Sequence, residues 1–405
     1  MMKIGIISLC LLSLSLVGIA QRNLKVKLTN KESVAFTDYM VRIPLKSIEA
    51  KIANFDATRY MVQDGKSGIA MQVASYNGTL YAIFPINLAE KDQKTIVITK
   101  ASKQFSYPKR TYAEITQKQG GVFVNRKYQG GEWVKTNAIR VADEHTDHSF
   151  DIKYEGPGWE SDKVGYRFYL DWRNATDLYG KITDAMVLNQ VGVDGFESYH
   201  HMCNWGMDIL KVGPSLGIGT IAYWDGGKAN RVAKTDSVTS QIVADGIIQS
   251  KIETNYYGWE IDGAKHLLKS TITIDAGSRA SHQELFVDGN LSNFCTGIIK
   301  DTKAELLVAN GNNTKWGYIA TWGPQSLNKD NLGLAILYKQ SDLIEKTEDK
   351  DNHVVVLKPT NGYVEYYFLG AWELEKNGIK SKEAFIAYLS NLQKQLSEPV
   401  EVKVL

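Results

Sequence analysis

The stretch AMQVASYNGTLYAIF, residues 70–84, contains the pattern that decides the fold. The residues on both sides of Asn77-Gly78 follow the two-residue period that is typical of half-buried strands. Asn-Gly favours a two-residue hairpin turn, because both residues tolerate a positive φ. The stretch therefore predicts two antiparallel strands that are joined by a tight turn.

The same two-residue period extends outward from this hairpin. Residues 24–28 read LKVKL and residues 95–99 read TIVIT, and both runs predict further strands. We therefore expect residues 21–105 to form a small N-terminal β-sandwich domain. Residues 104–110, which contain Pro108, are the predicted linker to the rest of the chain.

From residue 111 onward, short apolar runs alternate with turn signals such as Asp225-Gly226-Gly227. The helix that we expect covers residues 381–396, where Ser381 can cap the first turn. The sequence shows no alternation of strands with helices, and it contains no glycine-rich phosphate loop. Both observations argue against a nucleotide-dependent enzyme. We predict an all-β protein, with a large antiparallel, supersandwich-like catalytic β-sandwich over residues 111–405 and a C-terminal helix. Predicted strands of this sandwich are residues 148–154, 166–172, 270–274 and 354–357.

Residues 1–20 read MMKIGIISLCLLSLSLVGIA and have the pattern of a secretory signal peptide. Lys3 supplies the positive charge, an apolar run follows, and Gly18 and Ala20 fit the small positions before a cleavage site. A membrane anchor is the alternative, but the apolar run is short for a span of about 20 residues. We expect a periplasmic or secreted protein with no membrane association after cleavage.

Composition limits the possible partners. The 405 residues include 47 Lys and Arg against 45 Asp and Glu, so the formal net charge is +2. Such a balance gives no basic field, and nucleic acid is therefore not an expected partner. Three cysteines cannot form a disulfide scaffold, and Cys203 and Cys295 either pair or remain separate thiols. The sequence leaves the oligomeric state open.

Two segments are dense in functional groups. In a strand, Arg167, Tyr169, Asp171 and Arg173 would share one face. An arginine offers a planar fork that matches a carboxylate, so this face suits an acidic sugar. The alternative is that Asp171 simply pairs with both arginines on a solvated face.

The second segment contains Tyr199, His200 and His201, whose side chains are suited to proton transfer. The alternative is one structural and one surface histidine. His145 and His148 have a spacing that occurs in metal sites, so a structural or catalytic divalent metal is a further hypothesis. Trp259 is a candidate platform for a sugar ring.

The strings GPGWESDKVGYRFYLDWRNATDLYGK (residues 156–181) and YHHMCNWGMDILKVGPSLGIG (residues 199–219) resemble a family of secreted bacterial proteins with an uncharacterised domain. This family occurs in gene clusters that degrade polysaccharides, and it includes an oligosaccharide dehydratase that acts on ulvan fragments. The resemblance covers nearly the whole mature chain. It implies loss of water across C4–C5 of a non-reducing-end uronic acid, which leaves a 4,5-unsaturated uronyl residue.

The resemblance also implies roles for residues of the two segments, with no cofactor required. His200 is the first candidate for the base and Tyr199 the second, while the other of that pair or His201 would be the acid. Arg167 or Arg173 would neutralise the carboxylate of an anionic oligosaccharide. Residues expected to contact the substrate are Trp159, Glu160, Tyr169, Trp205 and Trp259.

Three other functions remain open from the sequence. A polysaccharide lyase would use nearly the same residues but expel a sugar instead of water. A non-catalytic carbohydrate-binding protein would bind through its Trp and Tyr side chains, with His200 dispensable. A mutarotase-like epimerase is the third alternative.

Overall fold

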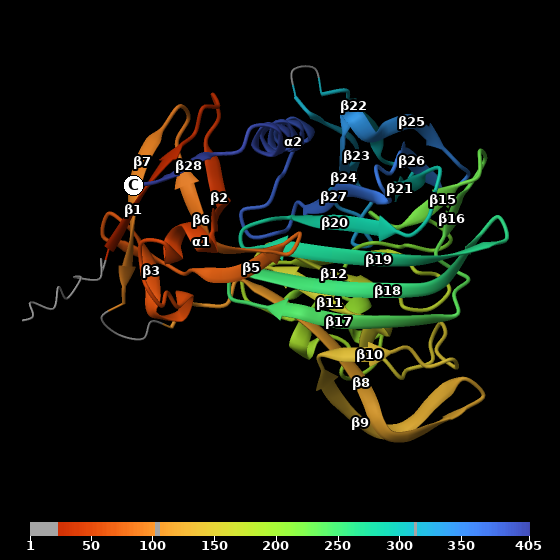
Figure 1. Ribbon diagram of the computed structural model, residues 1–405. Coiled ribbons are helices and arrows are strands. Elements are labelled where there is room, and N and C mark those ends of the chain that lie inside the picture. The colour runs from red at the N-terminus through yellow and green to blue at the C-terminus, as the bar shows by residue number, and fades with distance from the viewer. Residues whose placement is uncertain (1–22, 102–105, 312–313) are drawn as a thin grey trace, which may run out of the picture.

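The computed structural model describes residues 23–101, 106–311 and 314–405, and strands dominate throughout (Figure 1). The prediction of an all-β sandwich fold with a C-terminal helix is confirmed. The predicted signal peptide, residues 1–20, lies outside the described residues. Within those residues, no helix is long and apolar enough to cross a membrane.

Two small sheets pack against each other at the N-terminal end of the chain and enclose one apolar core. The first sheet has the order β28-β1-β7-β3-β4 and the second has the order β2-β6-β5. The predicted hairpin is present, because Tyr76 pairs with Thr79 around the turn. The elements are β1 (Asn23–Thr29), β2 (Phe36–Pro44), α1 (Leu45–Glu49), β3 (Tyr60–Asp64), β4 (Ser67–Ile69), β5 (Gln72–Tyr76), β6 (Thr79–Leu88), β7 (Gln93–Lys100) and β28 (Glu401–Val404).

The last strand of the chain belongs to the first of these sheets. Strand β28 pairs with β1 in antiparallel register, with Val26 opposite Val404. The domain boundaries at residues 105 and 111 stay a prediction, but residues 401–404 lie with the small domain and not with the large sandwich. Local sequence patterns carry no information on such a distant pairing.

A nine-stranded antiparallel sheet forms one layer of the large sandwich. Alternate residues of its strands, such as Leu334 and Ile336, point into the main core. Opposite residues, such as Ala335 and Leu337, point to the outer face. In sheet order its strands are β10 (Ala138–Arg140), β17 (Ser237–Asp245), β18 (Gln249–Ile261), β19 (Ala264–Asp275), β20 (Ala280–Val287), β27 (Tyr363–Trp372), β24 (Leu332–Lys339), β23 (Trp316–Gly323) and β22 (Glu305–Ala309).

Two smaller sheets contribute apolar side chains to the same core and form the other layer. The six-stranded sheet carries the residues of the candidate site. In sheet order its strands are β14 (Gly206–Asp208), β13 (Thr176–Lys181), β12 (Val164–Phe168), β11 (Gly158–Ser161), β8 (Thr111–Val124) and β9 (Lys127–Thr136). The five-stranded sheet consists of β16 (Ala229–Arg231), β15 (Ala222–Trp224), β21 (Phe294–Ile299), β26 (Asn352–Leu357) and β25 (Leu343–Glu348).

Helix α2 (Lys382–Ser397) covers part of the outer face of the nine-stranded sheet (Figure 1). The Ser381 side chain caps the helix by accepting a hydrogen bond from the backbone of Ala384, as its position predicted. Phe385 and Leu389 point down onto β23 and β24, where they complete an apolar cluster. Burial of this face, more than helix propensity, holds the helix in place.

Two predicted strands differ from the structure. Residues 148–154 form an irregular segment instead of a strand, and it ends in a short 3-10 turn at Lys153–Glu155. Strand β12 ends at Phe168, so the predicted strand over 166–172 is wrong after that residue. Asn174, with a φ of 39°, then turns the chain into β13. Cys203 and Cys295 are both free thiols.

Candidate functional site

Strand register brings the first charged side chains together. Arg167 on β12 lies directly opposite Asp177 on β13, and Tyr179 lies opposite Asp208 on β14. Strand β14 approaches β13 closely through Gly206, where φ is 131° and a Cβ atom would lie only 1.8 Å from the carbonyl oxygen of Gly180. This tight approach, open only to glycine, places Asp208 beside the end of Arg167.

Arg167 lies at the centre of a buried charge cluster. Its Nη2 is 2.7 Å from Asp177 Oδ2 and 2.8 Å from Asp208 Oδ2. Its Nε also donates to Asp177, and its Nη1 donates to the hydroxyl of Tyr199 at 2.8 Å. Tyr169 donates to Asp177 at 2.6 Å. Every nitrogen of the guanidinium group is therefore in use inside the protein.

Burial and crowding of like charges shift the pKa values in this cluster. Burial, together with the neighbouring Asp208 carboxylate, raises the pKa of Asp177 to about 6. Burial raises the pKa of Tyr199 to about 12, so its phenol stays protonated at neutral pH. Such perturbed groups gather at functional sites more often than elsewhere, but structural ion pairs produce them too.

This geometry corrects the predicted role of Arg167. The residue is only 3% exposed and its donors are already paired, so it cannot bind a substrate carboxylate directly. It instead holds Asp208 and Tyr199 in position. Tyr199 is also buried, and its hydroxyl contacts Arg167, which argues against a direct role as base or acid.

His200 is the member of the cluster that reaches the surface. Its side chain is 36% exposed, and its Nε2 lies 3.5 Å from Oδ2 of the buried Asp208. The contact with Asp208 raises the pKa of His200. Since Nε2 faces the carboxylate, the other ring nitrogen, Nδ1, is directed away from it. A carboxylate that orients an imidazole in this way is a common arrangement for general acid or base catalysis.

A second histidine–aspartate pair lies nearby on the irregular segment. Nδ1 of His148 is 2.6 Å from Asp147 Oδ1, and nearly half of the His148 side chain is exposed. His148, Phe150, Tyr154 and Glu155 all have positive φ values, between 39° and 71°. Several such non-glycine residues within one short segment indicate backbone strain, which is often kept at functional sites.

Phe196 lies between the two histidines. Its ring is 4.6 Å from that of His148 and 6.4 Å from that of His200, measured between ring centroids. Tyr199 contacts the His200 ring from the other side at 4.8 Å. Two partly exposed imidazoles, each next to a carboxylate, thus flank one half-buried phenyl ring.

Arg173 connects the Arg167 cluster with the segment that carries Asp147 and His148. It pairs with Asp171, with Glu155 at 2.8 Å and with Asp147 at 2.8 Å, and its guanidinium lies over the Tyr169 ring. The predicted neighbourhood of Arg167, Tyr169, Asp171 and Arg173 is therefore present, although a turn and not a strand creates it. The prediction that Asp171 pairs with both arginines is right for Arg173 only.

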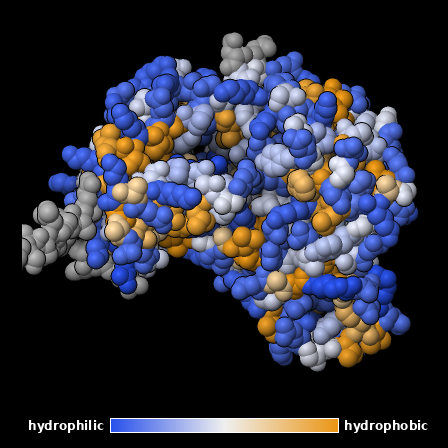
Figure 2. All heavy atoms as spheres, viewed as in Figure 1, coloured by the Kyte–Doolittle hydropathy of each residue, from blue (hydrophilic) through white to orange (hydrophobic). Residues whose placement is uncertain are grey.

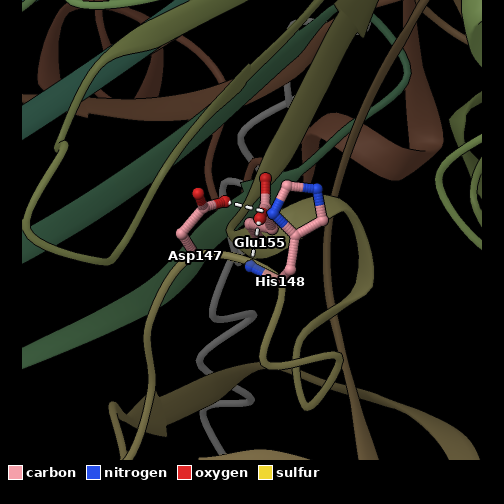
Figure 3. A group of neighbouring side chains, drawn as sticks. All are labelled: Asp147, His148 and Glu155. Atoms are coloured by element: carbon pink, nitrogen blue, oxygen red, sulfur yellow. Dashed lines mark hydrogen bonds and ion pairs between the residues drawn. The ribbon is translucent and has the colours of Figure 1, made fainter.

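Asp147, His148 and Glu155 are a candidate metal group, because their ligand atoms lie within 4.8 Å of one another (Figure 3). Two carboxylates and an imidazole suit a divalent cation. Arg173 is already paired with both carboxylates as well as with Asp171, so a cation would compete with its guanidinium for their oxygens. The predicted partner His145 is not in the group, because its ring is buried against Asp151.

The structure buries most of the side chains that were predicted to contact the substrate, which argues against direct contact. Trp159 is 1% exposed and donates its indole N–H to Ser281. Glu160 is enclosed with Lys181 and accepts two backbone N–H groups. Trp205 packs against Tyr179 in an apolar cluster, and Trp259 stacks on Phe294 in the main core. Tyr169 is buried as well, between Arg167 and Arg173.

Sequence reasoning also missed residues that the structure assembles. Asp208 and Phe196 were not selected, and His148 was considered only as a metal ligand. Asp208 lies within the string 199–219, so its proximity to His200 was the available signal. His201, in contrast, is an exposed residue at the end of the 3-10 turn Ser198–His200.

Two of the solved structures that are similar to this chain come from Enterococcus faecalis. One is described as a protein in glycosyl hydrolase family 38, with a TM-score of 0.44 and 8% identity over 96% of this chain and 48% of that chain. The other is described as an alpha-mannosidase from strain V583, with a TM-score of 0.44 and 10% identity over 95% of this chain and 46% of that chain. This chain thus spans about half the length of each.

Among curated proteins, none matches the sequence. A family model matches residues 28–402, which is nearly all of the described chain. The family is described as a domain of unknown function, DUF4861. On this match, the chain belongs to the DUF4861 family.

Proposed function

We propose that the protein is an oligosaccharide dehydratase that removes water across C4–C5 of a non-reducing-end uronic acid. The expected substrates are ulvan-type oligosaccharides of sulfated rhamnose and uronate, and the expected location is the periplasm or the exterior. One observation carries the proposal: His148 and His200 flank Phe196, and each lies beside a carboxylate. The resemblance of residues 156–181 and 199–219 to a family with such an enzyme supports it.

The reaction needs a base, an acid and a surface for the sugar ring. His200 Nδ1 takes the C5 proton, which is weakly acidic because it is α to the carboxylate. The electron pair of that C–H bond forms the C4–C5 double bond as the C4–O bond breaks. The departing hydroxyl takes a proton from the imidazolium of His148 and leaves as water. Phe196 offers its ring face to the sugar between the two groups.

Supporting groups hold these residues in place. Asp208 orients His200 and favours its protonated form, so the neutral ring is a stronger base. Arg167 holds Asp208, and Arg173 holds Asp147 and Glu155 beside His148. Arg167 thus pairs with the buried carboxylates next to His200, and Arg173 pairs with the carboxylates next to His148. The imidazoles are therefore the groups of this cluster left to face an acidic sugar.

The test uses purified protein and a panel of uronate oligosaccharides, including sulfated rhamnose–uronate types. Absorbance of the conjugated product and product mass are followed together. A rise in absorbance with loss of one water and unchanged chain length supports the proposal. Shorter unsaturated products would identify a lyase instead. No absorbance change over the whole panel would contradict both and favour a carbohydrate-binding protein.

A further inference from the structure

A cavity lies between the small domain and the outer face of the nine-stranded sheet, and none of the candidate-site residues lines it. Its volume is about 650 Å³. Strands β19, β20 and β27 form its floor, β2 of the small domain forms one wall, and α2 forms the other. Figure 2 shows the surface hollowed between these parts of the molecule.

The floor carries a row of cross-strand neighbours. Thr273 on β19 lies directly opposite His282 on β20, which in turn lies opposite Tyr367 on β27. Side chains at such positions share one face of the sheet and lie in contact distance. The His282 ring stacks on the Tyr367 ring, with centroids 4.3 Å apart and an interplanar angle of 12°. The row is therefore a rigid polar and aromatic surface.

Two polar atoms of this floor lack a partner. Nε2 of His282 contacts Glu365 at 2.6 Å, but its buried Nδ1 has no hydrogen bond to any described residue. The hydroxyl of Thr273 is likewise buried and unpaired within that part of the chain. A buried polar atom without a hydrogen-bond partner destabilises the folded protein. Thr273 and His282 both line the cavity, so these two atoms are the hydrogen-bonding positions of its floor that the protein itself does not use.

The wall contributes a cation that is not neutralised. Arg42 on β2 is exposed to solvent, and its guanidinium lies 4.0 Å above the Tyr76 ring. None of the described carboxylates lies within ion-pair distance of it. Of the other charged groups that line the cavity, Asp38 pairs with Arg110, Arg279 with Glu375, and Lys163 with Asp184. Asp275 accepts a hydrogen bond from the Gln249 amide. Asp275 acts on Arg42 electrostatically over a longer distance, so Arg42 is a cation without an ion pair whose N–H donors remain available to a ligand.

We propose that this interdomain cavity binds a polyhydroxylated ligand that carries an oxyanion, the chemical class of an acidic sugar. Arg42 binds the sulfate or carboxylate through paired N–H donors. Thr273 and His282 form hydrogen bonds with hydroxyl groups of the same ligand. Nothing in this site depends on the reaction at His200, so the protein would hold its glycan at two places. The small domain is then a part of the binding site and not only a support.

The test is isothermal titration calorimetry at millimolar sugar concentrations, on a His200→Ala background that prevents turnover. The probes are glucuronic acid, a rhamnose sulfate and neutral rhamnose. Arg42→Gln is expected to weaken binding of the anionic probes about tenfold or more, because charge-assisted hydrogen bonds are lost. Thr273→Val keeps the shape and removes the hydroxyl, and it should weaken binding several-fold.

The matched control is Arg59→Gln, which removes an exposed arginine of the same small domain that pairs with Asp56. It should leave all affinities unchanged. Loss of only the sulfate or only the uronate affinity in Arg42→Gln identifies the oxyanion and supports the site. Unchanged affinities in Arg42→Gln, equal binding of neutral rhamnose, or no measurable binding of any probe would overturn the proposal. These outcomes do not bear on whether the unmodified protein turns over uronates.

Discussion

Two carboxylate–cation pairs, one within the six-stranded sheet and one at its edge, differ in their access to solvent. Glu160 and Lys181 lie 2.6 Å apart, and both side chains are 0% exposed. Asp208 is buried in the same way, but its partner His200 reaches the surface. The first pair is closed off and contributes to the fold, whereas the second can transmit the charge of a buried carboxylate to a ligand.

The comparison shows that charge and burial alone do not identify a site. Burial raises the pKa of Glu160, just as burial raises that of Asp177 in the Arg167 cluster. Both are perturbed groups in clusters of ionisable side chains. Of these two clusters, only the Arg167 cluster has a histidine neighbour that reaches the surface, and this access is the reason why we propose a catalytic role for Asp208 and His200.

Replacing His200 should have the largest effect. We expect His200→Ala to lower kcat/KM on uronate oligosaccharides by roughly 10²–10⁴-fold, because the general base is lost. The melting temperature should hardly change, since the side chain is partly exposed. His201→Ala is the matched neighbour and should retain activity within about twofold of the unmodified enzyme. Equal losses of kcat/KM in His200→Ala and His201→Ala would show that the pair of Asp208 and His200 has no special role in turnover.

Breaking the closed pair should affect stability instead. Lys181→Met leaves the Glu160 charge buried without its partner, which costs about 3–5 kcal/mol of unfolding free energy. The double variant Glu160→Gln with Lys181→Met should recover part of this loss. Urea unfolding checks both, with Lys234→Met at an exposed ion pair as control, where about 0–1 kcal/mol is expected. A loss below 1 kcal/mol for Lys181→Met would contradict the account.

The sequence predicted most of the fold but only part of the site. Period-two patterns and the Asn-Gly turn identified strands, because these signals are local. The family resemblance led to the expectation that Trp159 and Glu160 contact a substrate, and no sequence pattern showed that their strand is buried on both faces. The positive φ values at His148 and Glu155, and the distance from His148 to Phe196, depend on the tertiary structure.

The pair formed by Asp208 and His200 also predicts a pH dependence. Asp208 raises the pKa of His200, so kcat/KM should rise with pH through that pKa as the base becomes neutral. In Asp208→Asn the midpoint of this rise should move to lower pH. The contact stabilises the folded protein while His200 is charged, so this stabilisation is present at low pH and is lost as pH rises through the folded-state pKa.

Proton NMR of the histidine rings, with His200→Ala for assignment, measures the same pKa without substrate. A His200 titration that stays at the same pH in Asp208→Asn would show that the carboxylate does not act on the imidazole. The pair would then be no different, in its effect on function, from the closed pair of Glu160 and Lys181.

Metal removal should have the smallest effect. Arg173 already occupies oxygens of Asp147 and Glu155, and the proposed reaction uses no metal, so we expect turnover after EDTA treatment and dialysis to equal that of the untreated enzyme. The control is the same assay with Ca²⁺ or Mn²⁺ added back. Activity that is lost with the chelator and restored by a cation would place the ion at Asp147, His148 and Glu155, and would give this second carboxylate group a role that the account does not assign.

The most direct measurement of the central claim compares the unmodified protein with His200→Ala and His148→Ala on one sulfated rhamnose–uronate oligosaccharide. Absorbance and product mass are recorded together. The account predicts an unsaturated product that is one water lighter and of unchanged chain length, formed by the unmodified protein and strongly reduced in both variants. An unsaturated product that forms at the same rate without either histidine would contradict it.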